Sequence, residues 1–370
     1  MDALTFRFSY RPALDGMRGL AVVLVVLSHS VRHTEGGGIG VQMFFTLSGF
    51  LITSLLLDER ARTGYVSLPN FYARRALRLL PPLLIMLALV AALPNVYRTP
   101  LDGHSMSRLI TIPLALFYMA NFGNIYGEGM GYLAHCWSLS VEEQFYIVWP
   151  VVALGLLRRG RLRQYLPWLI GGFITLRTLM TVTGIGDNPD WPTAQADGLL
   201  IGAWLACVLS VGLPSRWTSR RAGWGGLGAL LLLTLVGSAT HQGMQGRVGL
   251  YGGLTVCGLA SAALIGHLAA GDGSLVALFR WWPAVLTGRV SYGVYLFHFP
   301  IFQYFAHERW SQSKTLAIEY PVAALAVIAS WFLIERPCLK LKRRYESDRT
   351  TTASLVDRTT TGSASKGAVL

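Results

Sequence analysis

Residues 13–32 read ALDGMRGLAVVLVVLSHSVR, an apolar run that carries the ionisable side chains of Asp15, Arg18 and His29. About 20 apolar residues let a helix cross the bilayer core, and no cleavage site of a signal peptide follows this run. We therefore predict a first membrane span. At about 100° per residue the three side chains share one helix face, with Arg18 and His29 about 16 Å apart along the axis. Because charge inside a bilayer is costly, this face is expected to serve a function.

The rest of the chain has the same apolar character. Of its 370 residues, 52% are hydrophobic and only 14% are charged, whereas an average soluble domain has about 25% charged residues. We predict an all-α polytopic membrane protein with about ten transmembrane helices. The candidate spans are 13–32, 39–57, 77–94, 141–157, 165–183, 197–212, 225–241, 248–269, 284–305 and 316–335.

An eleventh apolar stretch, 109–122, is shorter and contains Pro113 and Asn121. Arginine clusters at 60–78 and 158–163 mark two cytoplasmic loops under the positive-inside rule, so the chain must cross an even number of times between them. Segment 109–122 is therefore predicted to be re-entrant or interfacial. Both termini are expected in the cytoplasm, with 1–345 forming one transmembrane domain and the Ser/Thr/Gly-rich 346–370 a disordered tail.

The net charge of +13 is the basic surplus that cytoplasmic loops carry, so we expect no nucleic acid as a partner. The four cysteines show neither metal-ligand nor disulfide spacing. We expect no metal site and no permanently bound cofactor.

Two glutamates begin the predicted span at 141–157. Ser140 and Glu143 match a capping box, a structural role for Glu143. Glu142 has no such explanation. It is expected at the outer end of its span, level with His29, as a candidate partner for an imidazolium or an acceptor. His29 is the favoured acid–base residue, because histidine exchanges protons near neutral pH.

Two further polar faces are candidates for substrate binding. Ser291, Tyr295 and His298 lie at helical spacing on one face, which fits either substrate contact or hydrogen bonding between helices. Arg75 and Arg78 share a face at the cytoplasmic side, which fits a phosphate clamp or ordinary positive-inside residues. Asp15 and Arg18 likewise fit a simple ion pair.

These residues fall in blocks that resemble the acyltransferase-3 family of bacterial membrane acyltransferases, from about Arg11 to Pro337. The blocks are Leu14-Asp-Gly-Met-Arg-Gly-Leu-Ala-Val with His29 spaced R-x10-H from Arg18, Phe44-Phe-Thr-Leu-Ser-Gly-Phe-Leu-Ile, Phe71-Tyr-Ala-Arg-Arg-Ala-Leu-Arg, Trp137-Ser-Leu-Ser-Val-Glu-Glu-Gln-Phe-Tyr, Ser291-Tyr-Gly-Val-Tyr-Leu-Phe-His and Glu335-Arg-Pro.

The resemblance implies ten core spans in the bacterial plasma membrane and O-acylation of a sugar, glycoside or polysaccharide hydroxyl by acyl-CoA. It implies that Arg18 and His29 are essential and that Arg75 and Arg78 serve the CoA side. Trp137 is expected to contact substrate. Gln195 stands where the family tends to have arginine, so acceptor choice is expected to differ. In size the chain is similar to stand-alone members that acylate macrolides or lipid-linked sugars.

Our hypothesis is that acyl-CoA enters from the cytoplasm with its phosphates near Arg75 and Arg78. The thioester stops near His29, which acts as general base, and Tyr295, His298 or a backbone amide stabilises the oxyanion. Acyl-CoA, a hydroxyl-bearing glycan and membrane lipid are the expected partners. The alternative is a polytopic transporter of a lipid-linked or glycosidic molecule that transfers no acyl group, because buried charges also suit transport.

Overall fold

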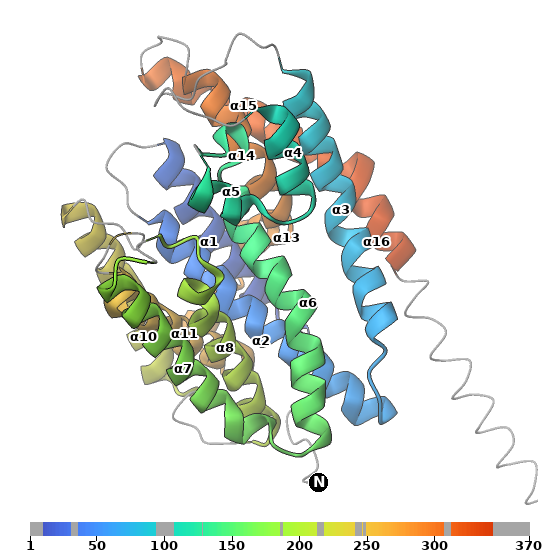
Figure 1. Ribbon diagram of the computed structural model, residues 1–370, viewed down its shortest axis with the longest axis vertical. Coiled ribbons are helices and arrows are strands. Elements are labelled where there is room, and N and C mark those ends of the chain that lie inside the picture. The colour runs from blue at the N-terminus through green and yellow to red at the C-terminus, as the bar shows by residue number, and fades with distance from the viewer. Residues whose placement is uncertain are drawn as a thin grey trace, which may run out of the picture.

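The computed structural model describes residues 10–30, 36–93, 107–127, 129–185, 188–212, 218–240, 246, 249–306 and 312–342. Within these ranges the chain is a bundle of helices without strands (Figure 1). The prediction of an all-α polytopic membrane protein is therefore confirmed. The proposed tail, 346–370, lies outside the described residues.

The helices of the first half are α1 (Pro12–Ser30), α2 (Gly37–Thr63), α3 (Leu68–Ala92), α4 (Arg108–Leu116), α5 (Ala120–Tyr126), the 3-10 turn η1 (Gly131–Leu133) and α6 (Cys136–Arg158). Those of the second half are α7 (Leu162–Val182), α8 (Pro192–Ser210), α10 (Arg220–Thr240), η2 (Gly249–Gly253), α11 (Leu254–Ala270), α12 (Ser274–Phe279), α13 (Trp282–Arg289), α14 (Ser291–Ala306), α15 (Gln312–Ser330), η3 (Trp331–Glu335) and α16 (Arg336–Lys342). The short segments η2 and η3 are π-helical.

We call the end of the bundle that holds the start of α1 and the α6–α7 junction the basal end, and the opposite end, where α4, α5 and α15 gather, the distal end (Figure 1). In the described residues, nine helical segments are long and apolar enough to cross a membrane. The outward faces of α7, α10 and α15 expose apolar side chains such as Trp168, Leu232 and Leu325. Such faces suit contact with lipid rather than water.

The predicted span 284–305 is not one helix. It divides at Val290 into α13, of 8 residues, and α14, of 16 residues, about 12 Å and 24 Å long. The cause is the docking of α13 along α1. A Cβ on Gly288 would lie 1.7 Å from the carbonyl oxygen of Asp15, so only glycine permits this approach. The chain follows α1 to Val290 and then starts a new helix.

Segment 109–122 forms no span of its own, as predicted. It falls into α4 and α5, which are about 13 Å and 10 Å long. Tyr118, in the left-handed region at φ 55°, separates the two. Both are too short to cross a bilayer core.

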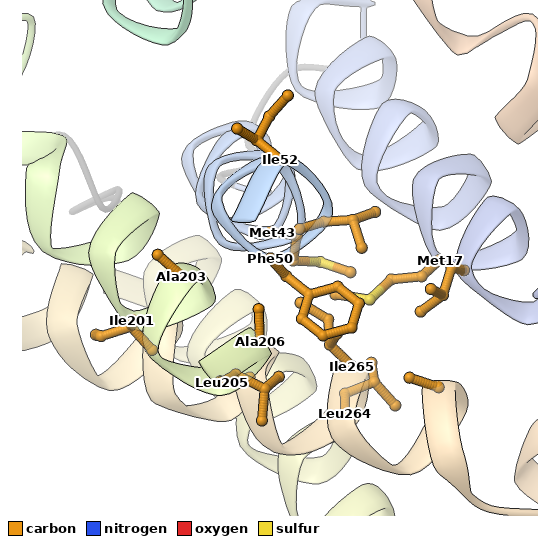
Figure 2. Close-up of a cluster of buried hydrophobic side chains, with 14 of the residues drawn as sticks. Met17, Met43, Phe50, Ile52, Ile201, Ala203, Leu205, Ala206, Leu264 and Ile265 are labelled. Carbon is orange, nitrogen blue, oxygen red and sulfur yellow. The ribbon is translucent and has the colours of Figure 1, made fainter. Parts of the chain in front are cut away.

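The apolar core lies where α1, α2, α8 and α11 meet. Figure 2 shows Phe50 of α2 among side chains that include Met17 of α1 and Leu264 and Ile265 of α11. Phe50 and Met17 are at most 1% exposed. This half of the bundle packs on one side of α1 and α2, while their other side faces the polar residues described next.

Candidate functional site

A cavity of about 110 Å³ lies between α1, α2, α3, α6 and α14. It collects predicted site residues from four of these helices, namely Arg18, Arg75, Arg78, Glu142, Ser291 and Tyr295. Its other lining residues are Val41, Phe44, Phe45, Ser48, Leu79, Ser138, Leu139, Glu143, Tyr146 and Tyr292. We call this space the arginine cavity.

Arg75 is fixed by an ion pair that the sequence analysis did not anticipate. Its Nε donates to Glu143 Oε2 at 3.0 Å, its Nη2 also contacts Glu143, and its guanidinium lies 3.2 Å from the centre of the Tyr146 ring. The capping-box interpretation of Glu143 is therefore wrong. The helix begins at Cys136, so Ser140 lies inside it and its hydroxyl donates to the Cys136 carbonyl at 2.9 Å.

Arg78 differs from Arg75 although both line the cavity. Among the described residues Arg78 has no hydrogen bond and no ion pair, and its side chain is accessible. Its five N–H donors are therefore available to a ligand. The charge of Arg75 is countered by Glu143, so the pair offers one free guanidinium rather than two.

Asp15 pairs with Arg18, with 3.2 Å between Oδ1 and Nη1. The aspartate is 8% exposed and also accepts a hydrogen bond from the Tyr10 hydroxyl at 2.7 Å. It does not line the cavity, whereas Arg18 does. The geometry gives Asp15 a clear structural task, which is to hold Arg18 in place.

Glu142 lies in the arginine cavity, where it accepts hydrogen bonds from the Tyr146 hydroxyl at 2.6 Å and from Ser48. The expectation that it lies level with His29 is wrong. His135, which directly precedes the first residue of α6, lies beside His298. Glu142 follows His135 by seven residues, which is about 10 Å along the helix. Glu142 is therefore a neighbour of Arg18 rather than of His29.

His29 belongs to a cluster of three histidines at the distal end. Its Nδ1 lies 3.2 Å from His298 Nε2, and the ring of His135 lies 5.7 Å from that of His298. Phe299 packs against both His29 and His135, at 5.0 Å between ring centres in each case. We call these three residues the histidine cluster. His135 was missed as a site residue, although its position two residues before the block that begins at Trp137 was a usable signal.

Tyr295 and Ser138 lie between the arginine cavity and the histidine cluster. Both line the cavity, and the Tyr295 hydroxyl donates to the His135 carbonyl at 2.7 Å while contacting the Ser138 hydroxyl. The Tyr295 ring lies 5.7 Å from that of His298. His29 itself does not line the cavity, so the predicted site is divided into two parts by a tyrosine.

Trp137 lies behind the wall of the cavity. It is 8% exposed and meets Phe45 edge to face at 6.3 Å between ring centres, and Phe45 lines the cavity. The part of the chain that the structure describes holds no group of three His, Cys, Asp or Glu side chains arranged to bind a metal ion.

The carboxylate of Asp190, in the loop before α8, is hydrogen-bonded near the histidine cluster. Asp190, which precedes α8, is 8% exposed and accepts a hydrogen bond from Asn124 Nδ2 at 2.8 Å. Asn124 also donates to the Ala134 carbonyl at 3.2 Å, next to His135. Burial raises the pKa of Asp190 from 3.8 to about 6, against a lowering by the Asn124 hydrogen bond.

Arg177 forms a second buried ion pair, with Asp197 at 2.8 Å. It also donates to the carbonyls of Leu250 and Ala194 at 2.9 Å and 3.0 Å. Gln195, the residue that departs from the family pattern, instead donates to the Pro189 carbonyl at 2.9 Å. Asp197, two residues after Gln195 in α8, is thus neutralised by an arginine of another helix, α7.

The family model for the acyltransferase domain matches residues 11–336. The chain is 30% identical over 357 residues to the O-acetyltransferase OatA of Staphylococcus aureus (strain NCTC 8325 / PS 47), covering 90% of this chain and 57% of the relative. It is 32% identical over 322 residues to the peptidoglycan O-acetyltransferase OatA of Listeria monocytogenes, covering 80% of this chain and 50% of the relative. The chain thus spans about half the length of these curated relatives. No solved structure matches it.

Proposed function

We propose that this chain, which belongs to the acyltransferase-3 family, transfers an acyl group from acyl-CoA to a hydroxyl of a polysaccharide, with His29 as general base. The names of these relatives, O-acetyltransferase and peptidoglycan O-acetyltransferase, favour acetyl as the group and a cell-wall glycan as the acceptor. The proposal includes a location in the bacterial plasma membrane, with the basal end of the bundle in the cytoplasm.

The observation that carries the proposal is the order of groups along the bundle. The free guanidinium of Arg78 and the partly exposed Arg18 line one cavity, and the histidine cluster follows beyond Tyr295. An acyl-CoA molecule has the matching order, with its phosphates at one end and its thioester at the other. Arg78 is proposed to bind the phosphates, because guanidinium groups recognise phosphate through paired N–H donors.

The chemistry follows from the two ends of that path. His29 removes the proton from the acceptor hydroxyl, and the oxygen attacks the thioester carbonyl carbon. The carbon–sulfur bond breaks, the ester is formed, and the departing thiolate takes up the proton from the His29 imidazolium. Transfer through an acyl-histidine is a variant with the same products. In either case the acyl group must pass Tyr295 and Ser138 to reach His29.

The test uses the full chain purified in detergent. We expect release of free thiol from acetyl-CoA when peptidoglycan fragments are present, and loss of that release in His29→Ala. Val23→Ala is a matched control, because Val23 lies on the same helix and is 43% exposed. A folded His29→Ala variant with full acyl transfer would overturn the assigned base. No thiol release from the wild type with any hydroxyl acceptor would instead favour transport.

A further inference from the structure

Both ring nitrogens of His298 have defined partners. Its Nδ1 lies 3.0 Å from the Val294 carbonyl oxygen and 2.8 Å from that of Tyr295. Its Nε2 lies 3.2 Å from His29 Nδ1. A carbonyl oxygen only accepts hydrogen bonds, so Nδ1 of His298 must carry a hydrogen.

The position of that hydrogen determines the others. A neutral imidazole has one N–H, so the Nε2 of His298 is an acceptor. The facing Nδ1 of His29 must then be the donor. This leaves the lone pair of His29 on Nε2, the nitrogen that does not face His298.

If His298 were doubly protonated, its Nε2 would be the donor and His29 Nδ1 the acceptor. The doubly protonated form is disfavoured by burial, because His298 is 1% exposed and no carboxylate among the described residues forms an ion pair with it. The rings of Phe299 and Phe302 pack edge-on against it, at 6.2 Å and 5.8 Å between centres. A buried cation without a partner is costly, so the neutral form is favoured.

We infer that His298 is a positioning residue that holds His29 as the Nδ1–H tautomer and so presents Nε2 as the basic nitrogen. The inference rests on the proposed function of His29. Both carbonyls that orient His298 belong to the preceding turn of α14, so its orientation does not depend on substrate. With Nδ1 engaged by carbonyls and Nε2 accepting from His29, His298 has no N–H left for an oxyanion. That role falls to other donors.

Glutamine and asparagine at position 298 provide a matched pair of variants. The amide oxygen of Gln reaches about as far as the imidazole Nε2 and can accept from His29, whereas the shorter Asn cannot. His298→Met fills the space without an acceptor. We expect His298→Asn and His298→Met to lower kcat by about 10- to 100-fold, by analogy with groups that orient metal-bound histidines. We expect KM for acyl-CoA to be unchanged and His298→Gln to restore most of kcat.

A second measurement does not depend on activity. Solid-state NMR of the full chain in lipid, labelled with ¹⁵N-histidine, distinguishes protonated from bare ring nitrogens, and the His29 signals are identified by their loss in His29→Gln. We expect His29 to be protonated at Nδ1 in the wild type and in His298→Gln, and to be a mixture in His298→Met. A wild-type His29 protonated at Nε2 would overturn the inference even if acyl transfer is intact. The expected spectrum without acyl transfer would overturn the proposed function instead.

Discussion

Arg75 of α3 and Glu143 of α6 form a two-point ion pair, with 3.0 Å between Arg75 Nε and Glu143 Oε2. The side chains are 19% and 9% exposed, and the guanidinium also covers the ring of Tyr146. Of the two arginines in the R-x-x-R block, one is thus part of the scaffold. Arg78 is the one whose guanidinium has no hydrogen bond or ion pair among the described residues.

Removing the charge of Glu143 is expected to destabilise the protein. In Glu143→Gln the Arg75 guanidinium loses its charged partner in a poorly hydrated place, and breaking a buried pair costs about 3–5 kcal/mol, less here because Arg75 is partly accessible. Thermal unfolding in detergent measures the change. The exposed pair Arg62–Asp58, with Arg62 68% exposed, is the control, and Asp58→Asn is expected to shift the unfolding temperature very little. Equal shifts for the two variants would contradict this account.

Arg78→Gln is expected to weaken donor binding without unfolding the protein. Because Arg78 has no hydrogen bond or ion pair among the described residues that its loss would break, the stability should hold. KM for acyl-CoA should rise about tenfold, the effect of one charge-assisted contact of about 1.4 kcal/mol. The comparison donor is acyl-pantetheine, which lacks the nucleotide phosphates. The KM for this donor should be the same in Arg78→Gln and in the wild type. An identical effect on both donors would argue against phosphate binding at Arg78.

The contributions of Tyr295 and Ser138 to the free energy of unfolding are expected to be coupled. The phenol has one hydrogen and gives it to the His135 carbonyl, so Ser138 must donate to the phenol oxygen. Tyr295→Phe should cost about 1–2 kcal/mol by leaving the His135 carbonyl without its donor. Ser138→Ala should then add almost nothing, which a double-mutant cycle on unfolding detects. The same cycle with Ser54→Ala, whose hydroxyl donates elsewhere, to the Phe50 carbonyl at 2.6 Å, should be additive. Additivity between Tyr295 and Ser138 would refute the link.

Asp190 gives a pH dependence with a defined sign. Its pKa is about 6 in the fold against 3.8 for the free group, so the folded state resists ionisation and loses stability as pH rises from about 4 to 6. Asp190→Asn removes this cost while keeping an acceptor for Asn124. We expect the variant to unfold at a higher temperature than the wild type at pH about 7.5, by a few degrees, and at the same temperature at pH about 4. A variant less stable at both pH values would show that the carboxylate itself stabilises the loop.

The features that depend on short stretches of sequence were predictable. The shared face of Asp15, Arg18 and His29 follows from helical spacing alone, and the failure of 109–122 to cross follows from its length and the arginine loops around it. The helix start at Cys136 was less visible, because Ser140 and Glu143 imitate a capping box. That error moved Glu142 about 10 Å from its true level.

Contacts between distant helices were not predictable from one sequence. His29 and His298 are 269 residues apart, and Arg75 and Glu143 are 68 apart. Helical spacing places each residue on a face, but it does not say which faces meet. The division of 284–305 into α13 and α14 has the same origin, since it depends on the approach of Gly288 to Asp15.

That glycine contact also bears on how the protein is made. The polar turn of α1 around Asp15 emerges from the ribosome first, and the helix that covers it, α13, emerges near the end. At about 5–20 residues per second the interval is on the order of tens of seconds. During that time α2 is already present and packs on α1, with Phe50 beside Met17, but the side of α1 that Gly288 approaches is still uncovered. The packing around the Asp15 carbonyl is therefore completed only when α13 has been made.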